Sequence, residues 1–167
     1  LWNLFNNTPW WILVGTGLAA LLFNAVRDSV AIYYFRDFVQ SSYKMTGTGW
    51  DMTTIYFLVG QAANLIGVIA APSISAKYGK KNTYMIAILM AGLLSVGFFF
   101  IPNNIYLILL FQFMISVFAG YVLPLLWSMF ADIVDHQEVV TGRRAPGLIF
   151  SSSSMSQKLG WAVGAAI

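Results

Sequence analysis

Three long stretches of the chain contain no charged residue, and they limit the possible folds more than any other feature. They cover residues 53–71, 83–101 and 105–131. A helix needs about 20 mostly apolar residues to cross the hydrocarbon layer of a membrane, and a helix of a soluble protein does not stay apolar on every face for that length. The sequence therefore predicts an all-α protein that crosses a membrane several times.

The composition agrees with this class. Hydrophobic residues make up 59% of the chain and charged residues 9%, whereas soluble domains contain about 25% charged residues. The net charge of +3 comes mainly from basic residues between the apolar stretches, which indicates membrane topology rather than a nucleic-acid partner. The sequence has no cysteine, which excludes disulfides and thiolate metal sites.

The apolar pattern predicts five membrane spans with short polar connections between them. Thr8 and Pro9 are typical of a helix start, Pro72 of a helix end, and a charged hairpin separates the last two spans. The spans are expected at residues 9–38, 53–71, 83–101, 105–131 and 146–167. The chain begins without Met and stops within an apolar stretch, so we expect it to be part of a longer protein.

Basic residues gather in two alternate connections, residues 72–82 and 132–145. Because loops rich in Lys and Arg stay on the cytoplasmic side, both connections are expected in the cytoplasm, and the first helix starts there. The five basic residues are Lys77, Lys80, Lys81, Arg143 and Arg144.

Two carboxylates precede the arginines of the second basic connection. Asp132 and Asp135 share one helix face, and we expect charge pairing with Arg143 and Arg144 to fix the hairpin rather than catalysis. The single histidine, His136, is interpreted as a solvated loop residue, and no metal site is predicted. The chain also lacks a catalytic triad or a nucleotide-binding loop, so an enzyme would need residues from elsewhere.

The first two spans carry polar groups on defined helix faces. Arg27 and Asp28 are turned apart by about 100°, so each is expected to need a partner on another helix or in water. Arg27 either anchors at the outer interface or faces a cavity. In the second span, Gln61 and Asn64 share a stripe with two glycines, which indicates either close helix packing or contact with a substrate. The cavity face of the first span contains Gly17, Ala20, Asn24, Arg27, Asp28, Ala31 and Tyr34.

Lys158 is the ionisable residue that most needs an explanation. It lies about 18 Å along a helix that starts near Pro146, close to the middle of a hydrocarbon layer about 30 Å thick. An ammonium group there needs a carboxylate, polar oxygens or water. Gln157 and Trp161 are near it in sequence, and an indole face beside polar groups suits a sugar ring. We therefore interpret Lys158 as functional.

Six short motifs occur along the chain as a set: NxPW at residues 7–10, AIYYF at 31–35, KxGKK at 77–81, PLLWSMFADIVD at 124–135, TGRR at 141–144 and QKLGWA at 157–162. Together they resemble the glycoside-pentoside-hexuronide:cation symporter family of the major facilitator superfamily. The resemblance implies twelve helices in two halves, with this chain as helices seven to eleven, and without the N-terminal half and the last helix. It also implies that Lys158 matches a lysine of the sugar and cation site.

The resemblance further implies sugar uptake across the cytoplasmic membrane, coupled to Na⁺ or H⁺, with no cofactor. Trp127 stands in a segment typical of the family and joins the substrate candidates, although it does not line up with the family's tryptophan in the tenth helix. The basic turn resembles the superfamily's gating motif, but Pro72 and Ala76 replace its glycine and its acid. A same-fold carrier of a lipid or drug-like substrate and a non-transporting sensor or scaffold remain alternatives.

Overall fold

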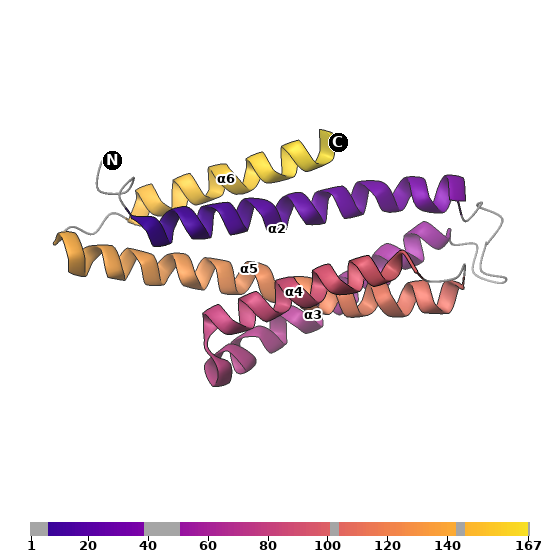
Figure 1. The fold of residues 1–167 in the computed structure, drawn as a ribbon, viewed down its shortest axis with the longest axis horizontal. Helices are drawn as coiled ribbons and strands as arrows, with labels where there is room; N and C mark the ends of the chain where they lie inside the picture. The colour runs from indigo at the N-terminus through magenta and orange to yellow at the C-terminus, as the bar shows by residue number, and fades with distance from the viewer. Residues whose placement is uncertain (1–6, 39–50, 101–103, 143–145, 167) are drawn as a thin grey trace. The chain divides into compact units, whose positions relative to one another are not determined.

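The computed structural model of the chain describes residues 7–38, 51–100, 104–142 and 146–166, and the regular elements within these ranges are all helical (Figure 1). The all-α prediction is confirmed for this part of the chain. The elements are α2 (Thr8–Tyr33), the π-helix η1 (Tyr34–Phe38), α3 (Met52–Tyr78), α4 (Lys80–Phe98), α5 (Ile105–Thr141) and α6 (Pro146–Ala166).

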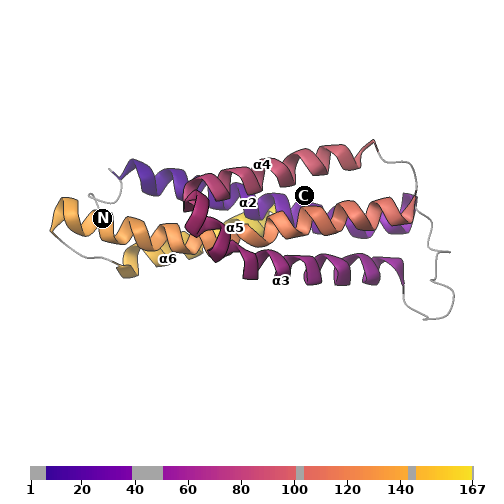
Figure 2. The same cartoon turned by 90° about the horizontal axis from the view of Figure 1, so that it is seen from below.

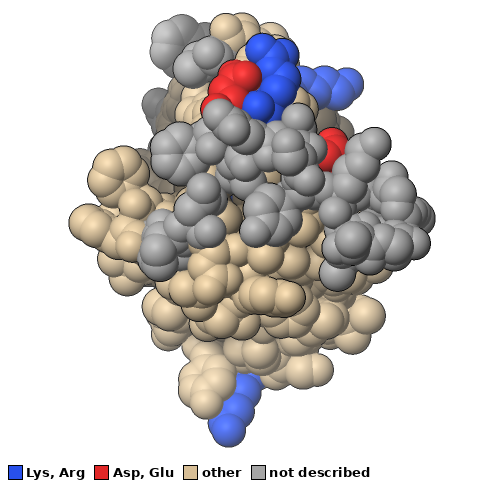
Figure 3. Space-filling model, turned by 90° about the vertical axis from the view of Figure 1, so that its right-hand side faces the viewer, with Lys and Arg blue, Asp and Glu red and all other residues tan. Residues whose placement is uncertain are grey.

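Four helices are long and apolar enough to cross a membrane: Thr8–Asp37, Met52–Tyr78, Lys80–Phe98 and Ile105–Val140. Large apolar side chains such as Ile69 and Leu93 are exposed, as expected for helices that face lipid. Among the residues that Figure 3 colours by type, most of the face is uncharged, and the charged ones lie toward its two ends. The helix α6 is not among the four, since serines, Gln157 and Lys158 make it more polar. Its crossing of the membrane stays a prediction.

The first helix begins one residue earlier than predicted. Asn7, rather than Thr8, occupies the capping position. The Oδ1 atom of Asn7 accepts a hydrogen bond from the backbone N–H of Trp10 at 3.3 Å, and its carbonyl accepts from Trp10 at 3.1 Å. Asparagine satisfies the free N–H groups of a first turn as well as threonine does.

Pro72 does not end the second span. The helix α3 continues through Pro72 to Tyr78, because a proline removes one backbone hydrogen bond but leaves the others to hold the turn. Ala71 is fully buried at this point. The helix ends at Gly79, whose φ of 83° favours glycine, and α4 starts directly afterwards at Lys80. The connection between α3 and α4, which was predicted as a short basic turn, therefore consists of Gly79 alone.

The charged residues after the fourth span also remain helical. The helix α5 continues to Thr141, beyond the membrane span that is predicted to end at residue 131. Ile133, Val134 and Gln137 are buried on one face, so the apolar stripe continues while Asp132 and Asp135 point outward. The N–H of Gly142 closes the helix with a 2.9 Å hydrogen bond to the carbonyl of Glu138.

The chain divides into two compact units, residues 1–29 with 126–167 and residues 30–125, and each is described by itself. In the first unit α6 lies alongside α2 (Figure 1). A Cβ atom added to Gly160 would lie 2.8 Å from the carbonyl oxygen of Leu18, and one added to Gly164 would lie 2.6 Å from the Cβ of Ala25. The two glycines, four residues apart, let the backbones approach closely.

In the second unit α3 contacts α4 and crosses α5, and Figure 2 shows α3 beside α5. Gly67 of α3 crosses Gly120 of α5, and a Cβ atom on either glycine would lie 3.0 Å from the Cα of the other. The sequence stripe on α3 predicted this packing for its glycines, and the structure confirms it.

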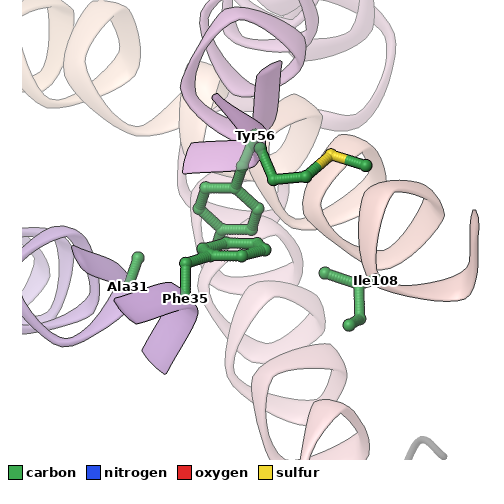
Figure 4. Packing of buried hydrophobic residues seen from close by; sticks show 5 residues of the cluster. Ala31, Phe35, Tyr56 and Ile108 are labelled. Carbon is green, nitrogen blue, oxygen red and sulfur yellow. The ribbon is translucent and has the colours of Figure 1, made fainter. Parts of the chain in front are cut away.

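An aromatic cluster occupies the same unit (Figure 4). The rings of Phe35 and Tyr56 meet edge to face, with centroids 5.1 Å apart. Both residues are almost fully buried together with Ala31, Met52 and Ile108. The AIYYF motif therefore has a packing role, because two of its members belong to this core.

Candidate substrate site

Lys158 and Gln157 lie on different faces of α6. The buried face of the helix contains Ile149, Ser153, Ser156, Gln157, Gly160 and Gly164. Lys158 and Trp161 lie on the exposed side, and 46% of Trp161 is accessible. Successive helical residues differ by about 100°, so a neighbour in sequence does not share a face. Within the described part of the chain, no salt bridge involves Lys158.

The Gln157 amide is buried and incompletely bonded. Only 9% of this residue is exposed, and its Nε2 atom has no hydrogen-bond partner among the described residues. The serines around it differ, because their hydroxyls donate to carbonyls of their own helix, as Ser153 does to Ile149 at 2.6 Å. Gln157 is therefore the side chain on this face with unused donor capacity.

Arg27 and Asp28 contact each other, which corrects the expectation that each would need a partner on another helix or in water. The Arg27 Nη2 atom lies 3.5 Å from Asp28 Oδ1. A long guanidinium side chain can span the angle between adjacent residues. The Arg27 side chain is 18% exposed, and its Nε and Nη1 atoms are buried with no partner among the described residues. The ion pair thus engages only one of its three nitrogens.

Asn24 lies one turn before Arg27 and is already bonded within α2. Its Nδ2 atom donates to the carbonyl of Ala20 at 2.9 Å, which leaves its Oδ1 as an acceptor. Gly17, Ala20 and Ala31 are buried while Asn24, Arg27 and Asp28 are partly buried. The inward orientation predicted for this face of α2 is therefore confirmed.

Arg27 and Lys158 lie at different levels of the first unit. Gly160 contacts Leu18 and Gly164 contacts Leu22 and Ala25, so α2 and α6 run in parallel. Lys158 precedes Gly160 by two residues and Arg27 follows Leu18 by nine, which separates their levels by about 16 Å at 1.5 Å per residue. A single sugar ring cannot contact both backbone positions, so these residues form two groups.

The remaining substrate candidates are distributed over both units. Gln61 is exposed and Asn64 is half-buried on α3 in the second unit. Trp127 of α5 belongs to the first unit and is 37% exposed. Its ring stacks on Phe150 of α6 with centroids 5.8 Å apart and an angle of 20°. One face of the indole is therefore covered.

Sequence reasoning missed one polar pair, Gln112 and Ser116 of α5. They are 1% and 2% exposed, and Gln112 Oε1 and Ser116 Oγ have no hydrogen-bond partner within the described residues. The Gln112 amide occupies the space next to Gly60, which has no side chain to fill it. The sequence feature that could have indicated this pair is the presence of two polar residues at positions i and i+4, on one helix face of an uncharged span.

The predicted gating cluster is only partly described. Lys77 and Lys81 are exposed, and the Lys77 ammonium lies 5.4 Å from the ring centroid of Tyr78. Asp132 and Asp135 are exposed and take part in further polar interactions, as does Lys80. Arg143 and Arg144 lie outside the described residues, so their pairing stays a prediction. In the described ranges, no group of three His, Asp or Glu side chains could hold a metal ion.

The sequence was compared with known protein families and proteins. The family described as MFS/sugar transport protein matches residues 1–167. YagG of Escherichia coli K12, provisionally named a glycoside/cation symporter, is 27% identical over 98% of this chain and 34% of its own length. The glucuronide carrier protein homolog of the same organism is 29% identical over 100% of this chain and 35% of its own length.

The isoprimeverose transporter of Lactiplantibacillus pentosus is 30% identical over 96% of this chain and 32% of its own length. The chain thus spans about a third of these curated relatives. No solved structure matches it. The matching family consists of transporters rather than enzymes, and the resemblance carried by the motifs is confirmed. The chain belongs to the MFS/sugar transport protein family, and with it to the glycoside-pentoside-hexuronide:cation symporters of the major facilitator superfamily.

Proposed function

We propose that this chain is part of a secondary transporter that couples the uptake of a sugar to Na⁺ or H⁺ across the cytoplasmic membrane. Family membership, four candidate spans and the names of relatives support this proposal. Those names include a glucuronide carrier homolog and an isoprimeverose transporter. The substrate is accordingly a glycoside, pentoside or hexuronide, and the chain forms helices seven to eleven of twelve.

The exposed position of Lys158 on α6 carries the proposal for the sugar site. The opposite face of α6 packs against α2 through Gly160 and Gly164. Lys158 and Trp161 are therefore free to meet a substrate or the rest of the protein. The ammonium group donates hydrogen bonds to sugar hydroxyls or balances the charge of the site, and the indole stacks on the ring's C–H face.

Gln157 supports this site from the neighbouring face. Its unused amide donor lies one residue from Lys158 and about 100° around the helix from it, on the buried side of α6. Asn24, Gln61, Asn64 and Trp127 remain secondary candidates. The stretches 72–82 and 132–145 lie in the cytoplasm, where Asp132 and Asp135 pair with Arg143 and Arg144. Lys77, Lys80 and Lys81 belong to the same gating motif region as candidates.

The test is uptake of labelled glycosides by the full-length protein in vesicles with a Na⁺ gradient, a proton gradient or neither. We expect uptake of one sugar that depends on one gradient. Lys158→Ala should reduce it by about ten- to a hundredfold, because a hydrogen bond to a charged group contributes about 1.5–3 kcal/mol. Val163→Ala, exposed on the same helix, is the control. Full uptake by Lys158→Ala would refute the site, and uptake of no sugar would favour a non-sugar substrate.

A further inference from the structure

A cluster of positive charge lies at the turn that joins α3 to α4 (Figure 1). Between Met52 and Ala131 the only charged residues of the sequence are Lys77, Lys80 and Lys81. Neither α3 nor α4 contains an acidic residue, so no carboxylate on these two helices neutralises the cluster. Like charges this close in the chain repel each other, and an anion bound beside them lowers that cost.

Lys77 and Lys81 are the members of the cluster that are open to a ligand. Both are exposed, and no salt bridge among the described residues involves either of them. The Lys77 ammonium lies 5.4 Å from the ring centroid of the exposed Tyr78, which holds the charge beside the turn. A Cβ atom added to Gly79 would meet nothing within 4 Å, so the space next to the turn is open. Lys80 is partly buried and takes part in a further interaction, and it is therefore not counted here.

The turn lies at the depth of the lipid headgroups. The helix α4 has 19 residues from Lys80 to Phe98, which is a length of about 28 Å at 1.5 Å per residue. Because the hydrocarbon layer is about 30 Å thick, α4 begins where that layer ends. Exposed tyrosines such as Tyr78 are typical of this interface, and in the proposed topology it belongs to the cytoplasmic leaflet.

An exposed apolar stripe on α4 continues from Lys81 into the membrane. Met85, Leu89 and Leu93 follow Lys81 at intervals of four residues and are 50%, 60% and 66% exposed. Residues four apart are neighbours on a helix surface. The distance from Lys81 to Leu93 is about 18 Å along the helix, close to the thickness of one leaflet of about 15 Å. A cation at the interface followed by an apolar stripe of this length matches a phospholipid better than a soluble anion, which would use the lysines alone.

We propose that Lys77 and Lys81 bind the headgroup of an anionic phospholipid of the cytoplasmic leaflet, whose acyl chains lie along the apolar stripe of α4. The lipid supplies the negative charge that α3 and α4 lack, and it attaches the α3–α4 turn to the membrane surface. Each lysine near a negatively charged membrane surface strengthens such an attachment by about fivefold. The site requires neither a sugar nor a cation gradient, so it goes beyond the proposed function and can be tested without transport.

The test measures lipid binding to the full-length protein in detergent by native mass spectrometry. Dioleoyl phosphatidylglycerol has a net negative charge, whereas dioleoyl phosphatidylcholine has the same acyl chains and no net charge. We expect the native protein to bind phosphatidylglycerol about thirtyfold more tightly, because two lysines contribute. Lys77→Gln combined with Lys81→Gln should weaken the binding of phosphatidylglycerol by about thirtyfold and leave that of phosphatidylcholine within about twofold.

The controls separate a lipid site from other uses of the lysines. Arg36→Gln should leave the binding of phosphatidylglycerol unchanged, because Arg36 is also exposed but has its own partner in Asp37 at 3.1 Å. Lys77→Arg combined with Lys81→Arg keeps both charges and should bind the lipid within about twofold of the native protein.

Three results would overturn the lipid site. One is equal binding of the two lipids by the native protein. Another is an unchanged preference for phosphatidylglycerol in the double glutamine variant, which would assign the lysines to contacts within the protein. The third is displacement of the lipid by an equal concentration of glycerol 3-phosphate, which has the phosphate without acyl chains and would assign the lysines to a soluble anion.

Discussion

Two helix interfaces in this chain obey the same packing rule but treat polar side chains differently. In the first unit α6 meets α2 at Gly160 and Gly164, and in the second unit α3 meets α5 at Gly67 and Gly120. Small residues allow close approach in both. The α3–α5 interface buries Gln112 and Ser116 almost completely, and the packed face of α6 likewise buries Ser153 and Gln157. The α2–α6 pair differs because it also leaves Lys158 exposed on α6 and Arg27 partly accessible on α2.

The difference follows from where the glycines lie. At the α3–α5 crossing both helices contribute a glycine, so the two backbones are in direct contact and the polar groups nearby are buried. At the α2–α6 contact only α6 contributes glycines, and they occupy one face of that helix. The opposite face keeps its polar groups accessible. Buried polar side chains contribute to helix association. Accessible polar side chains at membrane depth are available to bind a substrate.

The largest loss of stability is expected when a side chain is added where Gly67 of α3 contacts Gly120 of α5. This substitution tests whether the close contact of the two backbones holds the second unit together. Gly67→Val should destabilise the protein by about 3 kcal/mol or more, because the added atoms meet the backbone of Val117 and Gly120, which cannot move aside. Thermal unfolding of the detergent-solubilised protein, followed by gel filtration, measures the loss. Gly92→Ala is the matched control, since nothing lies within 4 Å of its added Cβ. An equally stable Gly67→Val protein would show that this crossing does not hold the unit together.

A smaller loss of stability is expected at the α2–α6 interface of the first unit, where only α6 contributes glycines. Gly160→Ala places a Cβ 2.8 Å from the Leu18 carbonyl, so α6 must shift by a few tenths of an ångström. We expect a net destabilisation of about 1–2 kcal/mol, because overpacking costs about 1–3 kcal/mol and alanine's helix propensity returns up to about 1. The same unfolding assay measures it. Gly147→Ala, with open space around its Cβ, should be neutral or stabilising, and identical results for the two variants would contradict a close α2–α6 contact.

The sequence was sufficient for the number and order of the described helices but not for their ends. Long uncharged windows predicted the helices, because no other structure satisfies the backbone in lipid. Pro72 suggested a helix end that the structure does not have, and α5 continues past residue 131 to Thr141. Buried neighbours such as Ala71 and Val134 continue the packed face through them, and this packing depends on other helices that a local pattern does not show.

The candidate site was predictable to a similar degree. The inward face of α2 followed from helical periodicity, and so does the separation of Gln157 from Lys158 once the 100° step is applied. The Arg27–Asp28 contact was missed because the length of the arginine side chain outweighs the angle between Cβ atoms. The burial of the Gln112 amide could not be predicted from the sequence pattern of α5, because it depends on Gly60 of another helix.

The last and smallest effect compares two buried amides, Gln112 at the α3–α5 interface and Gln157 on α6 next to Lys158. Gln112→Leu should change the free energy of unfolding by no more than about 1 kcal/mol in either direction, because it removes an amide whose oxygen has no partner in the described ranges and keeps most of the volume. Gln157→Leu should have a similarly small effect on stability, but it should reduce gradient-driven sugar uptake by about five- to tenfold, the worth of about one hydrogen bond. Uptake and unfolding are measured on the same preparations. If Gln112→Leu reduced uptake and Gln157→Leu did not, the assignment of the Gln112 amide to packing and of the Gln157 amide to the substrate site would be reversed, and the site would have to move from α6 to the α3–α5 interface.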